Sequence, residues 1–494
     1  MPGNTILLVD RAARFEGRVA TLDASGPTTY GALLGRSARV ASWLLDGVAH
    51  LREARVAFLV APSSDWVSVQ WGIWRAGGIA VPLAASHPPL ELEYVLDDAG
   101  VEAVIADADH AERLLPLARK RGIPLATVTE LSAIPTAPLP PIDAAGRALM
   151  VYTSGTTGRP KGVVTTHANI AAQVTTLVDA WGWNAEDHIV HVLPLHHVHG
   201  IINALSCAHW AGACVEFLPR FDAVRTWERL ASPDVTLFMA VPTIYHRLIA
   251  AWDAAGEEEK QCWSQGAHHL RLMVSGSAAL PVQTLERWRD ITAHTLLERY
   301  GMTEIGMALS NPLHGERRAG TVGQPLPSVE VRLVDDVGAP VATGMPGEIE
   351  VRGAQVFREY WRRPAETRDA FRDGWFITGD VAVLERDYYR ILGRKSVDII
   401  KTAGYKVSAL EIEEVLRTHP AVRDAAVVSA PDPDLGEKVC AAVVADGIEA
   451  ESLIDWARER LAPYKVPRTI RTVAELPRNA MGKVMKPELA RLFD

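Results

Sequence analysis

Short apolar runs alternate with longer amphipathic segments through the first third of this 494-residue chain. The amphipathic segments repeat at helical spacing, beginning with the one that starts near Thr28. Strands separated by helix-length segments must pair in parallel, because a parallel crossover needs a dozen or more residues. The sequence therefore predicts a large α/β domain. Its expected strands lie at residues 56–60, 79–83, 103–106 and 148–152.

The last hundred or so residues have a different pattern. Ser408 and Glu411 have the spacing of a capping box, which predicts a helix beginning there. Strands are expected at residues 425–429 and 439–444, on either side of the turn-rich segment APDPDLGEK, with another helix through 453–461. This order of elements predicts a small α+β domain at the C-terminal end.

Composition and charge exclude several functions. Lys and Arg number 51 against 60 Asp and Glu, a net charge of −9, so no electrostatic attraction to nucleic acid or to an anionic membrane is expected. Cys207, Cys214, Cys262 and Cys440 form no CxxC pair, which argues against a disulfide framework and a thiolate zinc site. Asp10 interrupts the N-terminal segment where a signal peptide is apolar, and no apolar run of about 18 residues occurs. We expect a cytoplasmic enzyme that acts on small molecules and has no obligate protein partner.

The segment YTSGTTGRPKG at residues 152–162 predicts a phosphate-binding loop. Glycines let backbone N–H groups converge on a polyphosphate, hydroxyls add donors, and the lysine adds a positive charge. The glycine spacing differs from that of a Walker A loop. A flexible turn without a ligand is the alternative, and the lysine and the preceding strand argue against it. The expected phosphate-binding residues are Thr153, Ser154, Gly155, Thr156, Thr157, Gly158 and Lys161.

This loop resembles the signature loop of the adenylate-forming superfamily, which includes acyl-CoA synthetases, firefly luciferase and the adenylation domains of peptide synthetases. Further motifs follow in the order typical of that superfamily: YGMTE at 300–304, GEIEVRG at 347–353, TGD at 378–380, GRKSVDIIK from 393, and PRNAMGKVMK up to 486. The resemblance spans nearly the whole chain. It implies that the protein uses ATP, Mg²⁺ and CoA, with an acyl-adenylate as intermediate.

The resemblance also implies roles for individual residues. Thr303 would bind the α-phosphate and Glu304 the Mg²⁺ ion, whose preferred ligands are oxygen atoms. Asp380 would accept the ribose hydroxyls, with Arg394 as its basic partner, and Tyr300 would lie against the adenine ring. For these residue types alone, a solvated carboxylate, a turn former and a surface charge are the alternatives. The implied nucleotide pocket is completed by Ser277, Ala278, Gly301 and Met302.

In this superfamily the small domain rotates between an adenylating and a thioester-forming arrangement. Lys483, in MGKVMK, resembles the lysine that bridges the acid and the α-phosphate during adenylation, although Met481 stands where a serine is common. Gly404 and Tyr405 would belong to the face that binds CoA. The implied domain boundaries are residues 1–394 for the large domain, 395–396 for the hinge and 397–494 for the small domain.

Three histidines occur in LPLHHVHG, a stretch that resembles the aromatic–His pair at the acyl pocket of this superfamily, although His196 stands where an aromatic residue is usual. His196, His197 and His199 lack the Asp of an HxHxDH cluster and a nearby cysteine, which disfavours a metal site. By resemblance, His197 is the expected gate residue of the acyl pocket, with a core histidine as the alternative.

Arg247 in VPTIYHR is the expected ligand of a second carboxylate in that pocket. It lies in an apolar helix start that we expect Thr243 to cap. An arginine there is costly to bury unless a carboxylate meets it, and a guanidinium binds a carboxylate through two parallel hydrogen bonds. By resemblance, Ser277 would lie beside the same carboxylate. A surface arginine on a helix is the alternative.

These stretches resemble malonyl-CoA synthetases most closely, which implies formation of malonyl-CoA from malonate, or of methylmalonyl-CoA from methylmalonate. Four alternatives remain open at this point. They are a CoA ligase for another short acid, an adenylation enzyme that loads a carrier protein, a luciferase-like oxygenase, and a nucleotide-binding scaffold without activity. The scaffold is disfavoured by the joint presence of Lys161, Glu304, Asp380, Arg394 and Lys483.

Overall fold

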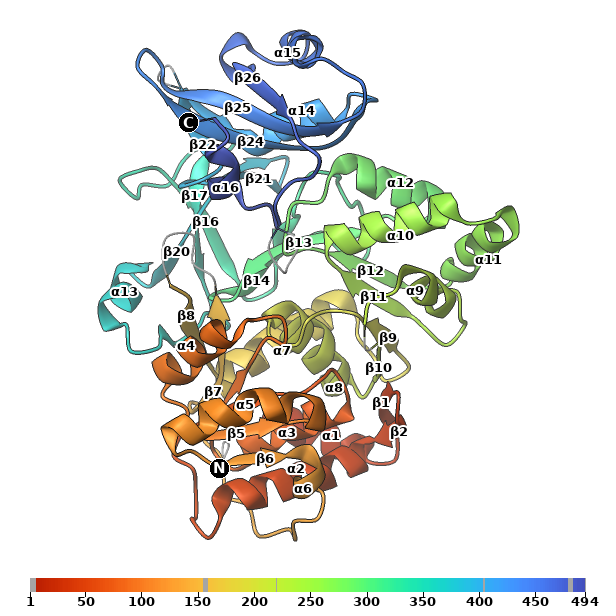
Figure 1. Cartoon of the computed structure of the whole chain (residues 1–494), viewed down its shortest axis with the longest axis vertical. Helices are drawn as coiled ribbons and strands as arrows, with labels where there is room; N and C mark the ends of the chain where they lie inside the picture. Colours follow the sequence, from red (N-terminus) through yellow and green to blue (C-terminus); the bar gives the residue numbers. More distant parts are fainter. Residues whose placement is uncertain (1–5, 154–158, 219, 403–404, 479–482, 494) are drawn as a thin grey trace.

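A computed structural model of the chain describes residues 6–153, 159–218, 220–402, 405–478 and 483–493. Figure 1 shows the N-terminal segments at the bottom, a lobe of helices α10 to α12 projecting to the right, and the C-terminal domain at the top. Two large sheets and one small sheet form the body below that domain.

The first large sheet has seven strands. The segments β3, β4, β5, β6 and β7 run parallel to their neighbours, whereas β8 and β18 add antiparallel pairs at one edge. Its strand order is β18 (Glu359–Tyr360), β8 (Lys161–Thr166), β7 (Arg147–Thr153), β4 (Ile79–Pro82), β3 (Arg55–Leu59), β5 (Ala103–Ala106) and β6 (Leu125–Thr127). The helices of this part are α2 (Tyr30–Leu45), α3 (Ser64–Arg75), α4 (Pro89–Ala99), α5 (Ala108–Arg121) and α6 (Val128–Leu131).

The second large sheet has nine strands, and its parallel centre ends in antiparallel pairs at both edges. Its order is β15 (Gln324–Pro325), β14 (Gly306–Ser310), β13 (Leu297–Met302), β12 (Leu272–Ser275), β11 (Leu237–Ala240), β9 (His188–His191), β10 (Cys214–Phe217), β1 (Val19–Asp23) and β2 (Gly26–Thr29). Its helices are α1 (Leu7–Ala12), η1 (Ala13–Phe15), α7 (His167–Trp181), the π-helix η2 (His199–Ser206), α8 (Cys207–Ala211), α9 (Ala223–Leu230), α10 (Pro242–Ala254), α11 (Glu257–Ala267) and α12 (Val282–Thr292).

Helix α7 joins the two large sheets, because it contacts β7 and β8 of one and β14 of the other. A third, antiparallel sheet lies between these sheets and the C-terminal domain (Figure 1). It consists of β16 (Glu330–Val334), β17 (Gly347–Arg352), β19 (Phe371–Arg372), β20 (Trp375–Glu385) and β21 (Tyr388–Arg394), with the short helix α13 (Pro364–Asp369) nearby.

The C-terminal domain is built on a sheet of its own. Its strands are β22 (Ile399–Thr402), β23 (Tyr405–Ser408), β24 (Val422–Asp432), β25 (Gly436–Ala445) and β26 (Thr469–Thr472), and its helices are α14 (Ala409–Arg417), α15 (Ala450–Arg458), η3 (Pro463–Lys465) and α16 (Lys486–Ala490). Among the described residues, no cluster of buried apolar side chains includes members from both sides of Arg394. The two domains therefore have separate cores.

Polar contacts link the two domains. Gln283 Nε2 donates to the Arg417 carbonyl at 2.7 Å, and the Lys406 ammonium lies 2.6 Å from the Asp336 carboxylate. The Ser408 hydroxyl donates to the carbonyl of Leu392. These contacts hold the small domain against α12 and against the third sheet.

The alternation of strands and helices is confirmed, with β5 at its predicted residues and β3, β4 and β7 within one residue of theirs. Only one of the two hydrogen bonds of the predicted capping box at Ser408 is present. The Ser408 hydroxyl does accept the Glu411 N–H, but the Glu411 carboxylate pairs with Lys465 Nζ at 2.6 Å instead of returning to the helix start. The expected strands at 425–429 and 439–444 are the centres of the longer pair β24 and β25.

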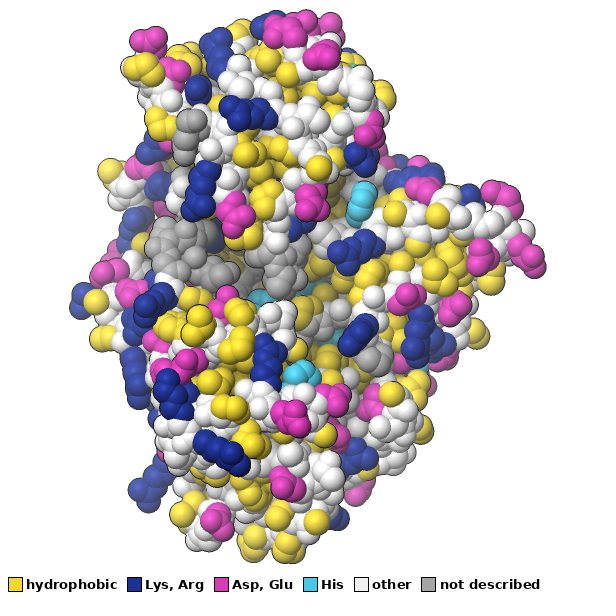
Figure 2. All heavy atoms as spheres, viewed as in Figure 1, with side chains coloured by type: hydrophobic (Ala, Val, Ile, Leu, Met, Phe, Trp, Pro, Cys, Tyr) yellow, Lys and Arg dark blue, Asp and Glu magenta, His cyan; other side chains and the backbone are white. Residues whose placement is uncertain are grey.

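The surface carries charges of both signs. Figure 2 shows Lys and Arg side chains interspersed with Asp and Glu over the visible face, rather than gathered in one basic patch. This mixture is in keeping with the net charge of −9. Among the described residues, every helix is too short or too polar to cross a bilayer.

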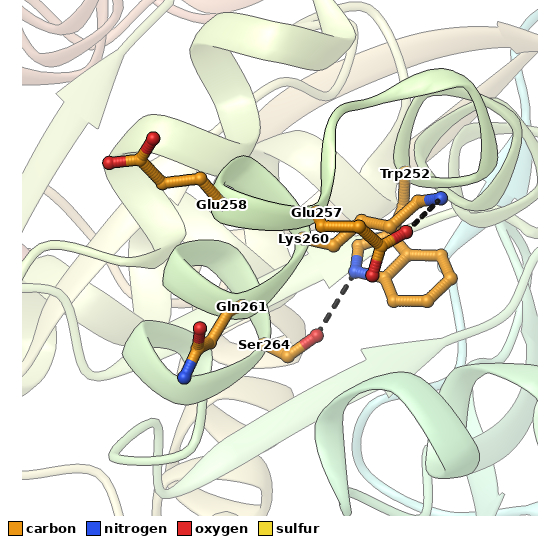
Figure 3. A pocket seen from close by; sticks show the side chains of 6 residues that line it. All are labelled: Trp252, Glu257, Glu258, Lys260, Gln261 and Ser264. Carbon is orange, nitrogen blue, oxygen red and sulfur yellow. Dashed lines mark hydrogen bonds and ion pairs between the residues drawn. The ribbon is translucent and has the colours of Figure 1, made fainter.

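An open hollow of about 530 Å³ lies between α10 and α11 (Figure 3). There the Trp252 indole N–H donates to the Ser264 hydroxyl, and the Lys260 ammonium lies beside the Glu257 carboxylate. None of the predicted site residues lines this hollow, which is therefore separate from the candidate active site.

Candidate active site

The predicted phosphate-binding loop joins two neighbouring strands. Thr153 at the end of β7 and Lys161 at the start of β8 are register partners, so the two ends of the loop lie side by side. The Tyr94 hydroxyl donates to the Pro160 carbonyl at 2.7 Å and holds the second end of the loop. Five predicted phosphate-binding residues lie outside the described residues: Ser154, Gly155, Thr156, Thr157 and Gly158.

Lys161 contacts α13 and β18 beside this loop. Its ammonium forms an ion pair with Glu366 on α13 and lies 5.1 Å from the centre of the Tyr360 ring. The Tyr360 hydroxyl in turn donates to Glu304 Oε1 at 3.0 Å. Two residues from separate sequence motifs, Lys161 and Glu304, therefore contact the same tyrosine.

Glu304 and Thr303 lie in the turn between β13 and β14. Gly306 ends the turn with φ at +61°, and a Cβ atom there would lie 1.7 Å from Gln173 Oε1, so a larger residue does not fit. Glu304 is only 6% exposed, and burial raises the pKa of its carboxyl group while the Tyr360 hydroxyl opposes that rise. This buried oxygen ligand is suited to a hard divalent cation.

The Asp380 carboxylate is the second acidic group of the site. The Tyr300 hydroxyl donates to Asp380 Oδ2 at 2.6 Å, and Arg394 Nε lies 3.8 Å from Oδ1. Asp380 and Arg394 are register partners on β20 and β21, which explains how two distant motifs meet. Burial raises the pKa of Asp380, and Arg394 opposes that rise. Gly301 and Met302 continue β13 beyond Tyr300.

Lys483 of the small domain lies close to this carboxylate. Its positive charge counteracts the burial that raises the pKa of Asp380, and it also acts on Asp398. An isolated β-bridge between Arg478 and Val484 closes the loop that carries Lys483. The structure thus brings Lys483 near Asp380, which lies about a hundred positions earlier in the sequence.

Ser277 contacts one of the histidines. Ser277 has φ at +73°, and its hydroxyl lies 3.2 Å from Nδ1 of His199 on the π-helix. The predicted gate residue His197 lies with its ring centre 4.3 Å from that of His196. Burial lowers the pKa of His197 to about 4 and that of His196 to about 2, so both rings are neutral near pH 7. Ala278 follows Ser277 in a half-buried position.

Arg299 has no role predicted from the sequence. It is 3% exposed on β13, and its Nε and Nη2 atoms have no hydrogen-bond partner in the described structure. A Cβ atom on Gly276 would lie 2.3 Å from the Arg299 guanidinium, so Arg299 packs directly against Gly276, the residue before Ser277. The pKa of His199 is far below its ordinary value, mainly because the ring is buried and secondly because the Arg299 charge lies nearby. The available sequence signal is its place in RYGMTE, directly before Tyr300.

Arg247 is exposed, whereas the sequence predicts a buried arginine. The expected helix start capped by Thr243 is wrong, because α10 begins at Pro242 after Val241. Tyr245 and Leu248 turn into the core, so helical periodicity places Arg247 on the exposed face. It makes no ion pair or side-chain hydrogen bond with any residue that the structure describes. A role in binding a carboxylate stays a prediction.

The structure describes one of the two predicted CoA-binding residues. Gly404 lies outside the described residues. Tyr405 is 53% exposed on β23 and stacks on Tyr464 with ring centres 4.2 Å apart. Its exposed aromatic face is compatible with contact to a ligand.

Comparison with known proteins identifies the class. Residues 8–361 match the model of the AMP-binding enzyme family, and residues 411–483 match the AMP-binding enzyme C-terminal domain. The chain therefore belongs to the AMP-binding enzyme family, and the predicted adenylate-forming fold with a small C-terminal domain is confirmed.

Three relatives are informative. The chain is 47% identical to the mitochondrial malonate–CoA ligase ACSF3 of Mus musculus, with 97% of this chain and 89% of the relative aligned. It is 43% identical to a malonate–CoA ligase of Arabidopsis thaliana over 91% of this chain and 79% of the relative. It is 35% identical to MatB of Rhodopseudomonas palustris, with a TM-score of 0.91 to the ATP-bound structure, covering 98% and 99% of the two chains, and of 0.83 to the apo structure, covering 99% of each.

The ion pair between Lys161 and Glu366 leads to a prediction about ATP affinity. Both side chains are partly exposed, at 35% and 42%, so the pair is worth at most about 1 kcal/mol. ATP phosphates would have to displace Glu366 from Lys161. The Glu366→Gln variant should therefore lower the KM for ATP by about two- to fivefold, with little change in kcat.

Steady-state kinetics at varied ATP concentration would check this effect. Asp369→Asn, an exposed change on the same helix, is the matched control and should leave the KM for ATP unchanged. An increased KM in the Glu366→Gln variant would show that Glu366 assists ATP binding.

Proposed function

We propose that this protein is an AMP-forming ligase that converts malonate, ATP and CoA into malonyl-CoA, AMP and pyrophosphate. The observation that carries the proposal is that four separate motifs converge on one site, through Lys161, Glu304, Asp380 and Lys483. The similarity to malonate–CoA ligases over nearly the whole chain supports malonate as the acid.

The reaction has two steps. A malonate carboxylate oxygen attacks the α-phosphorus of ATP, forming a new P–O bond while the bond to pyrophosphate breaks. The sulfur of CoA, after losing its proton, then attacks the acyl carbon, and the bond to AMP breaks. We propose that Lys161 binds the leaving phosphates and that Lys483 offsets charge at the α-phosphate, as expected for positioned cations in phosphoryl chemistry.

The site residues also fit a Mg²⁺ ion. Glu304 is a buried carboxylate whose described side-chain contact is a neutral tyrosine hydroxyl, and burial without a cation disfavours its charged form. We infer that Glu304 would hold Mg²⁺ and that the neighbouring Thr303 would bind the α-phosphate. When bound, the ion neutralises phosphate charge.

The domain arrangement supports the adenylating step. Lys483 lies close enough to Asp380 and Asp398 to affect both carboxyl groups. The higher TM-score to the ATP-bound relative than to the apo form is consistent with this arrangement. We propose that the small domain, residues 397–494, rotates about residues 395–396 and brings Gly404 and Tyr405 to the site for the thioester step.

The second carboxylate of malonate requires a cation. Arg247 remains our proposed ligand together with Ser277, because its guanidinium has no partner among the described residues and is exposed on α10. Arg299 adds a second, buried positive charge beneath Ser277, with Nε and Nη2 unpaired in the described structure. A carboxylate near Ser277 would therefore meet a positive electrostatic potential. The cytoplasmic location stays a prediction, since the vertebrate relatives are named as mitochondrial.

The test of the function is an acid panel of malonate, methylmalonate, acetate and butyrate, each with ATP and with CoA, carrier protein or no acceptor. We expect CoA-dependent formation of AMP and pyrophosphate to be fastest with malonate. ADP as the product would reject the adenylate mechanism. Transfer to a carrier protein in place of CoA would favour the loading enzyme, and light emission with oxygen would favour a luciferase-like reaction.

The position of Lys483 leads to a prediction about the two half reactions. Lys483→Ala should slow adenylation from malonate and ATP by about 10² or more, because a positioned cation is removed. Thioester formation from chemically prepared malonyl-AMP and CoA should stay near the wild-type rate, since that step uses the rotated arrangement. Rapid-quench measurement of each half reaction would check this split. Equal decreases in both would contradict the two arrangements.

The two arginines lead to a prediction about acid selectivity. Arg247→Leu should lower kcat/KM for malonate by about 10- to 100-fold, because the charge-assisted hydrogen bonds to the second carboxylate are removed. The value for butyrate, which has no second carboxylate, should change little or not at all. Arg289→Leu, an exposed arginine on α12, is the matched control. If Arg247→Leu keeps the malonate preference while Arg299→Gln abolishes it, Arg299 is the carboxylate ligand instead.

A further inference from the structure

A buried lysine lies three residues after Lys483, at the start of α16. Lys486 is 8% exposed, and its ammonium lies 2.5 Å from Asp398 Oδ1 and 2.7 Å from Glu413 Oε1. Both carboxylates are themselves largely buried, with side chains 15% and 5% exposed. The ammonium is therefore enclosed by two anions, which offset its desolvation.

Each anion is fixed by a further contact. Glu413 Oε1 accepts the backbone N–H of Val427 on β24 at 2.9 Å, and Glu413 lies on α14. Asp398 Oδ2 accepts the backbone N–H of Arg394 at 2.9 Å, directly across the expected hinge. Lys486 therefore links the start of α16 to Glu413 on α14 and to Asp398. Through these two carboxylates it is also linked to the backbone of β24 and to the backbone of Arg394, the residue proposed to bind ribose.

The same segment holds the loop of Lys483. The backbone N–H of Met485 donates to the carbonyl of Pro477 at 2.8 Å, and Arg478 forms a β-bridge with Val484. Lys483 directly precedes that bridge, and Lys486 follows two residues after it. Displacement of the start of α16 would therefore shift Lys483 relative to Asp380.

We propose that Lys486 is a positioning residue for the adenylation step, which holds Lys483 in place through its buried ion pairs with Asp398 and Glu413. This proposal rests on the two-step reaction inferred above. Apart from the bond to Arg394, all members of the cluster lie in the small domain and rotate with it. A role limited to stability would therefore affect both half reactions, whereas a role through Lys483 affects only the half reaction that uses Lys483.

The test compares Lys486→Met with Lys486→Arg in the two half reactions. In Lys486→Met we expect adenylation to fall by about tenfold or more and thioester formation from supplied malonyl-AMP to stay within about twofold. Lys486→Arg, which keeps the charge, should recover most of the adenylation rate. Arg423→Met, an exposed change on β24 of the same domain, is the control and should leave both rates unchanged.

A double variant makes the test specific. If Lys486 acts through Lys483, adding Lys486→Met to Lys483→Ala should cause little further decrease in adenylation. Independent, multiplying decreases, equal decreases in both half reactions, or no decrease in the single variant would overturn the proposal. If the single variant does not fold, Lys486→Met with Glu413→Gln keeps the net charge of the cluster and serves in its place. A wild-type protein that forms no adenylate would instead refute the proposed function itself.

Discussion

The buried carboxylate of Asp380 connects three structural units that the proposed reaction uses. It accepts a hydrogen bond from Tyr300 on the nine-stranded sheet, and it faces Arg394 at the end of the third sheet. Lys483 of the small domain also acts on it. Because burial penalises an isolated anion, Asp380 needs these partners, and they keep three structural units in one relative position.

Local patterns predict the elements well because they depend on neighbours in sequence. The alternation of apolar runs places β3, β4 and β5 within one residue, and the glycine-rich motif places the phosphate loop between β7 and β8. Resemblance to a known family then links Thr303, Glu304, Asp380 and Lys483, and the structure brings these motifs together. Spacing alone cannot do so, since the contacts depend on strand register, such as that between Asp380 and Arg394.

Apart from the helix caps expected from Thr243 and Glu411, the errors and omissions concern burial, which a single sequence indicates poorly for charged residues. Arg247 is predicted to be buried, but Tyr245 and Leu248 occupy the core face of α10 and leave it exposed. Arg299 and Lys486 are buried, yet each lies in a stretch where an exposed cation is the ordinary expectation. Their environments are created by Gly276, Asp398 and Glu413, and no local pattern indicates those neighbours.

The separate cores on the two sides of Arg394 have a consequence for the energetics of the proposed domain rotation. When the small domain leaves α12 and the third sheet, hydrogen bonds and exposed ion pairs break, and water replaces them at little net cost. Little apolar surface has to become wet, so the heat capacity of the two arrangements should be nearly equal. Dissolved salt, which screens the pair between Lys406 and Asp336, would then shift their populations more than temperature does.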